Sequence, residues 1–303
     1  MGYVRVIALL RGDKQQAAVA ALEDFRAQFT DHALAADALH LLATTEHQRR
    51  RYDASQRHCR TFAEQYPSHA LASVIAFLLA ENSFLSGKYE DAVKGYRRFG
   101  ARFSDDPQAG KARYRLGTAL YRLERFDEAE SLLAEAGGAD KGDDVFRSSL
   151  LFLGDIHFQR GEWKQAEENL SKYLSSGPDV SSADDALLKL GLARQRQERY
   201  REAVEAYDRL IEQYEQSPHR LQALFERGQA LVAMNETGTA AEAFEQVLAE
   251  GGDSRFAFHA LNHLGTIAIG AKNFTGAADY FERAAGMGPS SCPPRPCFNK
   301  DRL

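Results

Sequence analysis

Apolar residues in this chain recur three and four positions apart, which is the spacing of one face of an α-helix and not of a β-strand. One arrangement of small, apolar and aromatic residues then returns every 37 positions. A small residue anchors each of seven periods, and an eighth period extends the series back to Val6. The eight anchors are Val6, Ala43, Ala80, Gly117, Gly154, Gly191, Gly228 and Gly265. The pattern therefore predicts eight repeats that fill residues 1–289.

Each period is predicted to form a hairpin of two helices. A short break, such as Gly87–Tyr89 or Gly161–Trp163, divides the period into two segments with helical spacing. Six periods carry an aromatic residue nine positions after the anchor: Tyr52, Tyr89, Phe126, Trp163, Tyr200 and Phe274. Small residues at the anchor and twelve positions later let the two helices approach closely, and the aromatic ring fills the gap between them. One hairpin cannot bury its own apolar face, so we expect neighbouring hairpins to stack in series.

This pattern resembles the tetratricopeptide repeat, and the resemblance covers nearly the whole chain. The usual unit has 34 residues, and the additional residues here fall in the connector after the second helix, as in Tyr66–Ser68 and Phe103–Pro107. That connector is similar to those of bacterial envelope repeat proteins, such as the outer-membrane-barrel assembly lipoprotein and the Tol–Pal cell-division coordinator. The resemblance implies an all-α fold, namely a right-handed α-solenoid of about eight helix-turn-helix repeats.

Charge and hydropathy restrict the possible partners. A formal net charge of −5 and an isoelectric point near 6.0 provide no positive field for nucleic-acid binding. The longest apolar run, within residues 70–80, is too short to span a bilayer. The first ten residues make a poor secretory signal. As written, the sequence predicts a cytoplasmic protein, or a periplasmic one if the envelope resemblance holds and the N-terminus is truncated.

The resemblance also predicts where a partner would bind. In that family the first helix of each pair lines the concave side, and residues six and three before the anchor and one and four after it share one helix face. Six aromatic residues form a stripe on this face: Phe77, Phe84, Tyr114, Tyr121, Phe158 and Phe225. The basic side chains Lys111, Arg115 and Arg122 lie near the stripe, and His40 and His47 share the face in an earlier repeat. Such aromatics either anchor a peptide or fill the space between repeats, and the sequence leaves both interpretations open.

Two further patterns bear on the ligand. A clamp for an acidic C-terminal peptide, found in some members of the family, requires asparagines where Thr44 and Glu81 stand, so that ligand is disfavoured. His259 and His263 have the spacing of a two-histidine metal site, but no third ligand is nearby. No phosphate-binding glycine loop, nucleophile elbow or four-cysteine metal motif is present in the sequence.

The sequence therefore predicts a protein that is not an enzyme and that has no cofactor and no metal. Its predicted function is to hold a partner protein or peptide along the concave groove. The alternatives are a structural or assembly subunit of a bacterial cell-envelope complex and a fragment of a longer repeat protein.

The two ends of the chain look different from the repeats. The first repeat has no preceding cap, and residues 290–303, which contain three prolines together with Cys292 and Cys297, are predicted to be an irregular, disordered tail. Uncapped solenoid ends expose an apolar face. Self-association through these ends is therefore a further prediction.

Overall fold

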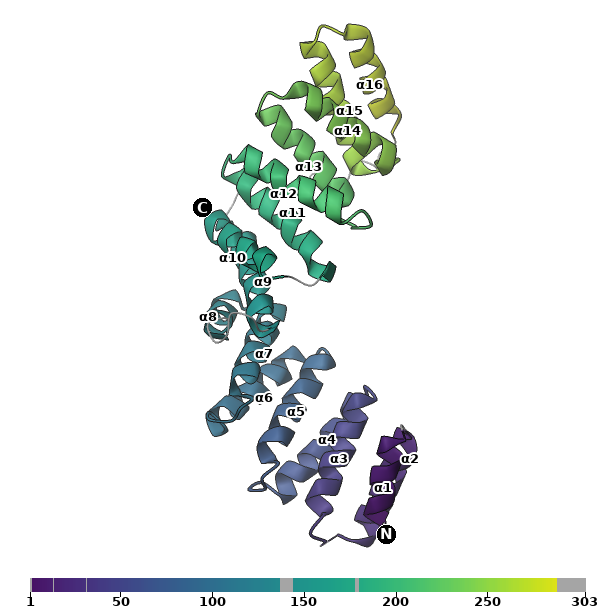
Figure 1. Ribbon diagram of the computed structural model, residues 1–303, viewed down its shortest axis with the longest axis vertical. Helices are drawn as coiled ribbons and strands as arrows, with labels where there is room; N and C mark the ends of the chain where they lie inside the picture. The colour runs from purple at the N-terminus through teal and green to yellow at the C-terminus, as the bar shows by residue number, and fades with distance from the viewer. Residues whose placement is uncertain (1, 13, 31, 137–143, 178–179, 288–303) are drawn as a thin grey trace. The chain divides into compact units, whose positions relative to one another are not determined.

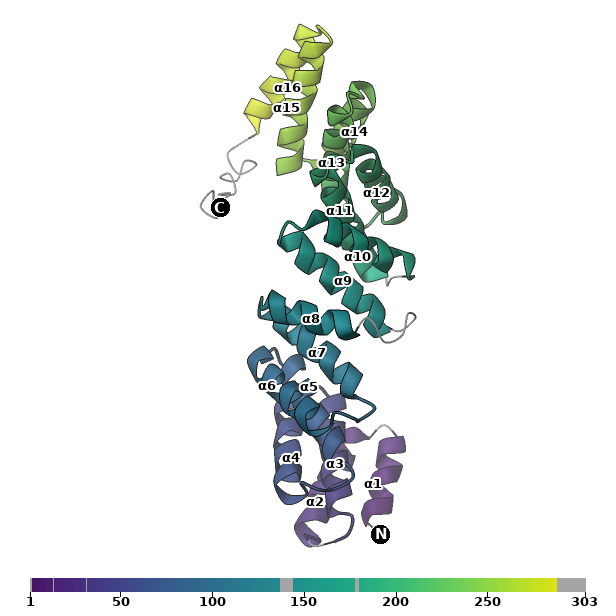
Figure 2. The same cartoon turned by 90° about the vertical axis from the view of Figure 1, so that its left-hand side faces the viewer.

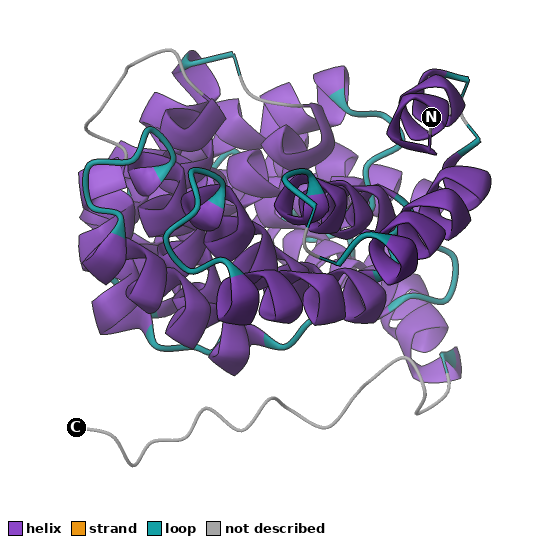
Figure 3. Ribbon diagram, turned by 90° about the horizontal axis from the view of Figure 1, so that it is seen from below, coloured by secondary structure: helices purple, strands orange, loops and turns teal. Residues whose placement is uncertain are grey.

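Second helices begin 37 residues apart throughout the structure. The computed structural model describes residues 2–12, 14–30, 32–136, 144–177 and 180–287, which form sixteen α-helices and, within those ranges, no strand (Figure 3). The second helices of the hairpins are α2 (Gln15–Gln28), α4 (Tyr52–Gln65), α6 (Tyr89–Arg102), α8 (Phe126–Ala136), α10 (Trp163–Ser175), α12 (Tyr200–Gln213), α14 (Thr237–Gly251) and α16 (Phe274–Gly286). The residue nine positions after the anchor is thus the first residue of its second helix.

First helices alternate with the second helices along the chain. They are α1 (Gly2–Arg11), α3 (Ala35–Gln48), α5 (Ala72–Leu85), α7 (Ala109–Arg122), α9 (Asp144–Gln159), α11 (Val180–Arg196), α13 (Arg220–Ala233) and α15 (Arg255–Gly270). None of the helices in the described ranges is long and apolar enough to cross a membrane.

The chain divides into two compact units, Met1–Phe152 and Leu153–Leu303. In the first unit, α1 packs with α2, α3 with α4, α5 with α6 and α7 with α8 (Figures 1 and 2). In the second unit the same pairing joins α11 to α12, α13 to α14 and α15 to α16. Second helices also pack on the first helix of the next hairpin, as α4 does on α5 and α12 on α13.

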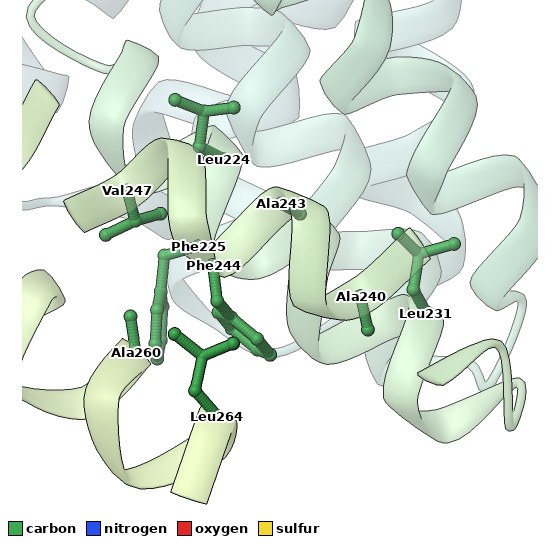
Figure 4. Packing of buried hydrophobic residues seen from close by; sticks show 9 residues of the cluster. All are labelled: Leu224, Phe225, Leu231, Ala240, Ala243, Phe244, Val247, Ala260 and Leu264. Carbon is green, nitrogen blue, oxygen red and sulfur yellow. The ribbon is translucent and has the colours of Figure 1, made fainter. Parts of the chain in front are cut away.

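The hydrophobic core is built by contacts within hairpins and between successive hairpins. In the second unit, Phe244 of α14 is fully buried and packs beside Phe225 of α13 and Leu264 of α15 (Figure 4). In the first unit, Cys59 and Phe62 of α4 join residues of α3 and α5 in one buried cluster. Stacking of hairpins, and not a single central core, therefore removes the apolar faces from water.

Seven first helices end in the same left-handed turn. The residues with positive φ at these turns are Arg50, Gly87, Glu124, Gly161, Glu198, Asn235 and Lys272, with φ between 57° and 74°. At Gly87 the amide donates to the carbonyl of Phe84 at 3.0 Å, and the amide of Lys88 donates to that of Ser83 at 2.9 Å. This pair of bonds defines a Schellman motif, which satisfies carbonyls that would otherwise be left unpaired at a helix end.

The all-α, repeated helix-turn-helix fold predicted from the sequence is confirmed. The limits of the predicted 1–289 solenoid remain a prediction. The segment 290–303, including Cys292 and Cys297, lies outside the described residues.

Candidate functional site

Two cations on α7 cover two aromatic rings on α5. The ammonium of Lys111 lies 5.4 Å from the centre of the Phe77 ring, and the guanidinium of Arg115 lies 5.1 Å from that of Phe84. Lys111 is exposed, whereas Arg115 and Phe84 are half-buried. A cation over an aromatic face is attracted by the negative charge of the ring. Residues that the sequence places in neighbouring repeats therefore form one continuous surface here.

Phe77 and Phe225 belong to the packing between helices. They are only 7% and 6% exposed. The Phe77 ring lies 5.8 Å from the rings of both Tyr96 and Phe99 in α6, and Phe225 lies 5.8 Å from Phe244. Phe77 and Phe225 therefore fill the space between helices and do not offer their rings as anchors for a peptide.

The aromatic residues four positions after the anchor occupy the hairpin turn. Each is half-buried and lies against the ring that begins its second helix. The ring centres are 5.6 Å apart for Phe84 and Tyr89, 5.8 Å for Tyr121 and Phe126, 5.4 Å for Phe158 and Trp163, and 5.8 Å for His47 and Tyr52. These rings hold the turn together and still leave part of their surface accessible.

The remaining predicted residues are accessible and sit on first helices. Tyr114 is half-buried and Arg122 is exposed, both on α7. His40 on α3 is half-buried, and that burial lowers the pKa of its imidazole, an effect partly opposed by Asp37. His40 thus favours the neutral form, in which one ring nitrogen can accept a hydrogen bond.

The predicted residues do not all come together. We define the first-helix face as the accessible residues of α3, α5 and α7 in the first unit: His40, His47, Phe84, Lys111, Tyr114, Arg115, Tyr121 and Arg122. Phe158 and Phe225 lie in the second unit, outside this face.

The buried carboxylate of Glu81 lies beneath the first-helix face and pairs with Arg115. Glu81 is 7% exposed, accepts a hydrogen bond from the Tyr96 hydroxyl at 2.5 Å and pairs with Arg115 at 2.9 Å. Burial, followed by the neighbouring Glu81 charge, raises the pKa of Tyr96, so its hydroxyl stays protonated as a donor. The charge of Glu81 is therefore neutralised within the protein and is not offered to a ligand.

The repeat pattern does not predict this ion pair or its equivalent in the second unit. Asp155 and Lys189 form an ion pair between α9 and α11, and Lys189 also pairs with Asp185 at 2.8 Å. Both buried carboxylates stand one position after an anchor, and both cations stand two positions before the next anchor. Opposite charges at this spacing of 34 residues were the signal in the sequence that could have revealed the pairs.

The described residues hold no cluster of three potential metal ligands. His263 stacks flat on Phe244 with ring centres 4.8 Å apart, and burial, with the nearby His259, lowers the pKa of its imidazole. Burial also raises the pKa of the Cys59 thiol to about 12, which keeps it in the unreactive protonated form. These groups are core residues of the repeats.

Comparison with known proteins gives one consistent family. Two family models, both described as tetratricopeptide repeat, match the chain, one at residues 82–144 and 225–291 and the other at 182–249. No curated protein matches the sequence.

Solved structures share the fold at low sequence identity. The C-terminal part of a repeat protein from Cytophaga hutchinsonii aligns with a TM-score of 0.65 and 15% identity over 82% of this chain and 95% of that chain. A tetratricopeptide repeat protein from Parabacteroides merdae aligns at 0.54 and 15% over 84% and 93%. The quorum sensor NprR from B. thuringiensis aligns at 0.53 and 11% over 94% and 86%.

Proposed function

Since this chain belongs to the tetratricopeptide-repeat family, whose members generally mediate interactions between proteins, we propose that it is a binding scaffold that holds a segment of a partner protein on its first-helix face. The family is generally non-enzymatic, in agreement with the sequence prediction. The specific part of the proposal is that the partner segment binds at the first-helix face.

One observation carries this proposal. Lys111 and Arg115 of α7 stack on aromatic rings of α5, and the ammonium of Lys111 stays exposed while Arg115 pairs with Glu81. Arginine and aromatic side chains dominate the energetics of protein interfaces because they combine apolar area with directed polar groups.

The charges of the face favour an acidic partner segment. Lys111 and Arg122 are exposed on α7, and Arg115 is already matched by Glu81. Carboxylates of a bound segment would meet Lys111 and Arg122 without the repulsion that an unpaired Glu81 would cause.

Charge reversal of the exposed cations tests the proposal. We expect the double variant Lys111→Glu, Arg122→Glu to bind the native partner, once purified from source cells, at least about tenfold more weakly by calorimetry, which is about 1.4 kcal/mol. The matched control is Lys164→Glu, Arg209→Glu, which changes the net charge equally at exposed positions of α10 and α12. Equal affinity of the two double variants would reject the first-helix face as the binding surface.

A further inference from the structure

Two adjoining hollows lie on the other side of the first unit, between α4 and α6. One has a volume of about 170 Å³ and the other about 230 Å³, and both are lined by Leu79, Gly95 and Arg98. Their floor is α5, which packs against both α4 and α6 (Figure 1). We call the pair of hollows the α4–α6 groove.

A glycine lines both hollows at a position where the other repeats carry side chains. Gly95 stands fifteen positions after its anchor, and the other seven equivalent positions carry side chains: Ala21, His58, Leu132, Asn169, Ala206, Ala243 and Tyr280. A Cβ atom at Gly95 would lie 2.8 Å from the Cβ of Ala80, closer than two such atoms can approach. The missing side chain at Gly95 thus lets α5 and α6 approach closely beside the hollows.

The larger hollow is mostly apolar inside, the smaller one combines Leu79 and Ala80 with polar side chains, and both are sized for single side chains. The larger hollow is lined by Phe62, Ile75, Ala76, Leu79 and Phe99, among others. Each hollow is smaller than the roughly 300–1,000 Å³ of common small-molecule pockets but larger than the cavity of about 150 Å³ that holds a benzene molecule. Two short hollows suit two separate apolar side chains better than one long acyl chain.

The rim of the groove is cationic. Arg60, Lys94, Arg98 and Arg102 line it, and Asp91, which pairs with Lys94 at 3.8 Å, is the sole acidic side chain in the lining of these two hollows. Arg98 is exposed and has no ion-pair or hydrogen-bond partner within the described part of the chain.

The charge of α6 supports this picture. It carries four basic and two acidic side chains, whereas each of the other second helices has at least as many acidic as basic side chains. The positive field is thus concentrated where the hollows open.

We propose that the α4–α6 groove is a second binding site, which takes a segment of a partner protein that carries bulky apolar side chains flanked by carboxylates. The apolar side chains enter the two hollows, and the carboxylates pair with Arg98 and its basic neighbours. The site shares no residue with the first-helix face. The two surfaces can therefore be inactivated separately.

A selection experiment on the full chain tests this proposal and requires no identified partner. A random dodecapeptide library displayed on phage is selected against the wild-type protein, and the most enriched peptides are synthesised with a fluorescein label. We expect acidic peptides with two bulky apolar residues, and we expect anisotropy titrations to show at least a tenfold loss of affinity for Arg98→Glu. Ala63→Trp should weaken binding as well, because Ala63 is exposed and lines the larger hollow.

Control variants separate this groove from the rest of the protein surface. Arg209→Glu changes the same charge on another second helix, and Lys111→Glu changes the first-helix face, so neither should reduce affinity for the peptides whose binding Arg98→Glu weakens. The proposal is overturned if no enriched peptide depends on Arg98, or if Arg98 is instead required for binding to phosphatidylglycerol vesicles. It is also overturned if Arg98→Glu only dissociates a dimer of the chain in light-scattering measurements.

Discussion

The anchor residue and the residue sixteen positions later are matched in size. Gly228 faces the ring of Phe244, and a Cβ atom at Gly228 would lie 2.6 Å from it. Ala43 is the anchor of its own repeat, where the residue sixteen positions later is the small Cys59. At Gly191, Gly228 and Gly265 a large ring is accompanied by glycine, because the packed interior there has no space for both a ring and a methyl group. Ala80, which precedes Tyr96 by sixteen positions, departs from this match.

Gly191 is the position where this match can be tested most clearly. A Cβ atom there would run into the ring of Tyr207, so Gly191→Ala should lower the free energy of unfolding by about 1–3 kcal/mol. Gly100 in α6 has no neighbour within 4 Å of a Cβ atom, so Gly100→Ala should instead raise stability by up to about 1 kcal/mol. Urea denaturation followed by circular dichroism measures both, and equal effects would mean that the helices are not in close contact at Gly191.

Buried histidines give the stability a pH dependence. Burial lowers the pKa of His263 and of His40, so the folded chain binds fewer protons than the unfolded chain. Above the unfolded pKa of about 6.5 both states are neutral at these groups, and stability is lost as the pH falls from that value through the lower pKa of the folded chain.

His263→Phe should therefore reduce the pH dependence of the melting temperature. Phenylalanine keeps a ring against Phe244 but cannot be protonated. We expect a smaller drop in melting temperature between about pH 7.5 and pH 5 for the variant than for the wild-type chain. An unchanged drop would show that His263 titrates equally in the folded and unfolded chains.

At the scale of the element, the repeated unit is defined by its turn. The left-handed residue falls seven positions after the anchor in all seven of the turns described, but it is glycine in only two of them, Gly87 and Gly161. A side chain in this conformation crowds the following carbonyl oxygen, which costs about 1–2 kcal/mol per residue. The other five turns carry this cost because the Schellman hydrogen bonds and the hairpin packing require the conformation.

Glu198→Gly should accordingly stabilise the chain. Glu198 is exposed and has a φ of 60°. Relief of the backbone strain, partly offset by the greater freedom of glycine in the unfolded chain, predicts a gain of about 0.5–1 kcal/mol. Gly87→Ala should show the opposite sign, since Gly87 has a φ of 74° and open space around it. Thermal unfolding of both variants checks the pair, and a loss of stability in Glu198→Gly would contradict this account of the turn.

The sequence predicts the elements better than it predicts the surface. The period of 37 residues places the start of α4, α6 and α12 at Tyr52, Tyr89 and Tyr200, because the ring after the turn is required by hairpin packing. Lys111 and Arg115 of the next repeat cover the rings of Phe77 and Phe84 and so determine how much of each ring is accessible. The pattern within one repeat carries no information about these side chains of its neighbour.

The α4–α6 groove could not be predicted from the pattern for a related reason. Gly95 lines both hollows, and glycine in a helix commonly indicates only a turn or a close helix contact. Gly95 stands out only when the repeats are aligned with one another, because the equivalent positions in the other repeats carry side chains.

At the scale of the whole molecule, each unit contains its own buried ion pair at the same repeat register. Glu81 pairs with Arg115 in the first unit, and Asp155 pairs with Lys189 in the second. Removal of one partner from a buried pair leaves an uncompensated charge, whereas replacement of both by apolar residues is often tolerated. The pairs therefore favour one alignment of neighbouring hairpins and keep the first helices polar at their surface.

Site-specific photo-cross-linking tests the central claim, that the first-helix face binds a partner, most directly. Benzoylphenylalanine is introduced at Tyr114 on α7 or at Arg209 on α12, and each variant is irradiated with the purified native partner. We predict a cross-linked protein at Tyr114 that disappears in the Lys111→Glu, Arg122→Glu background, and none at Arg209. A cross-link at Arg209 with none at Tyr114 would contradict the account.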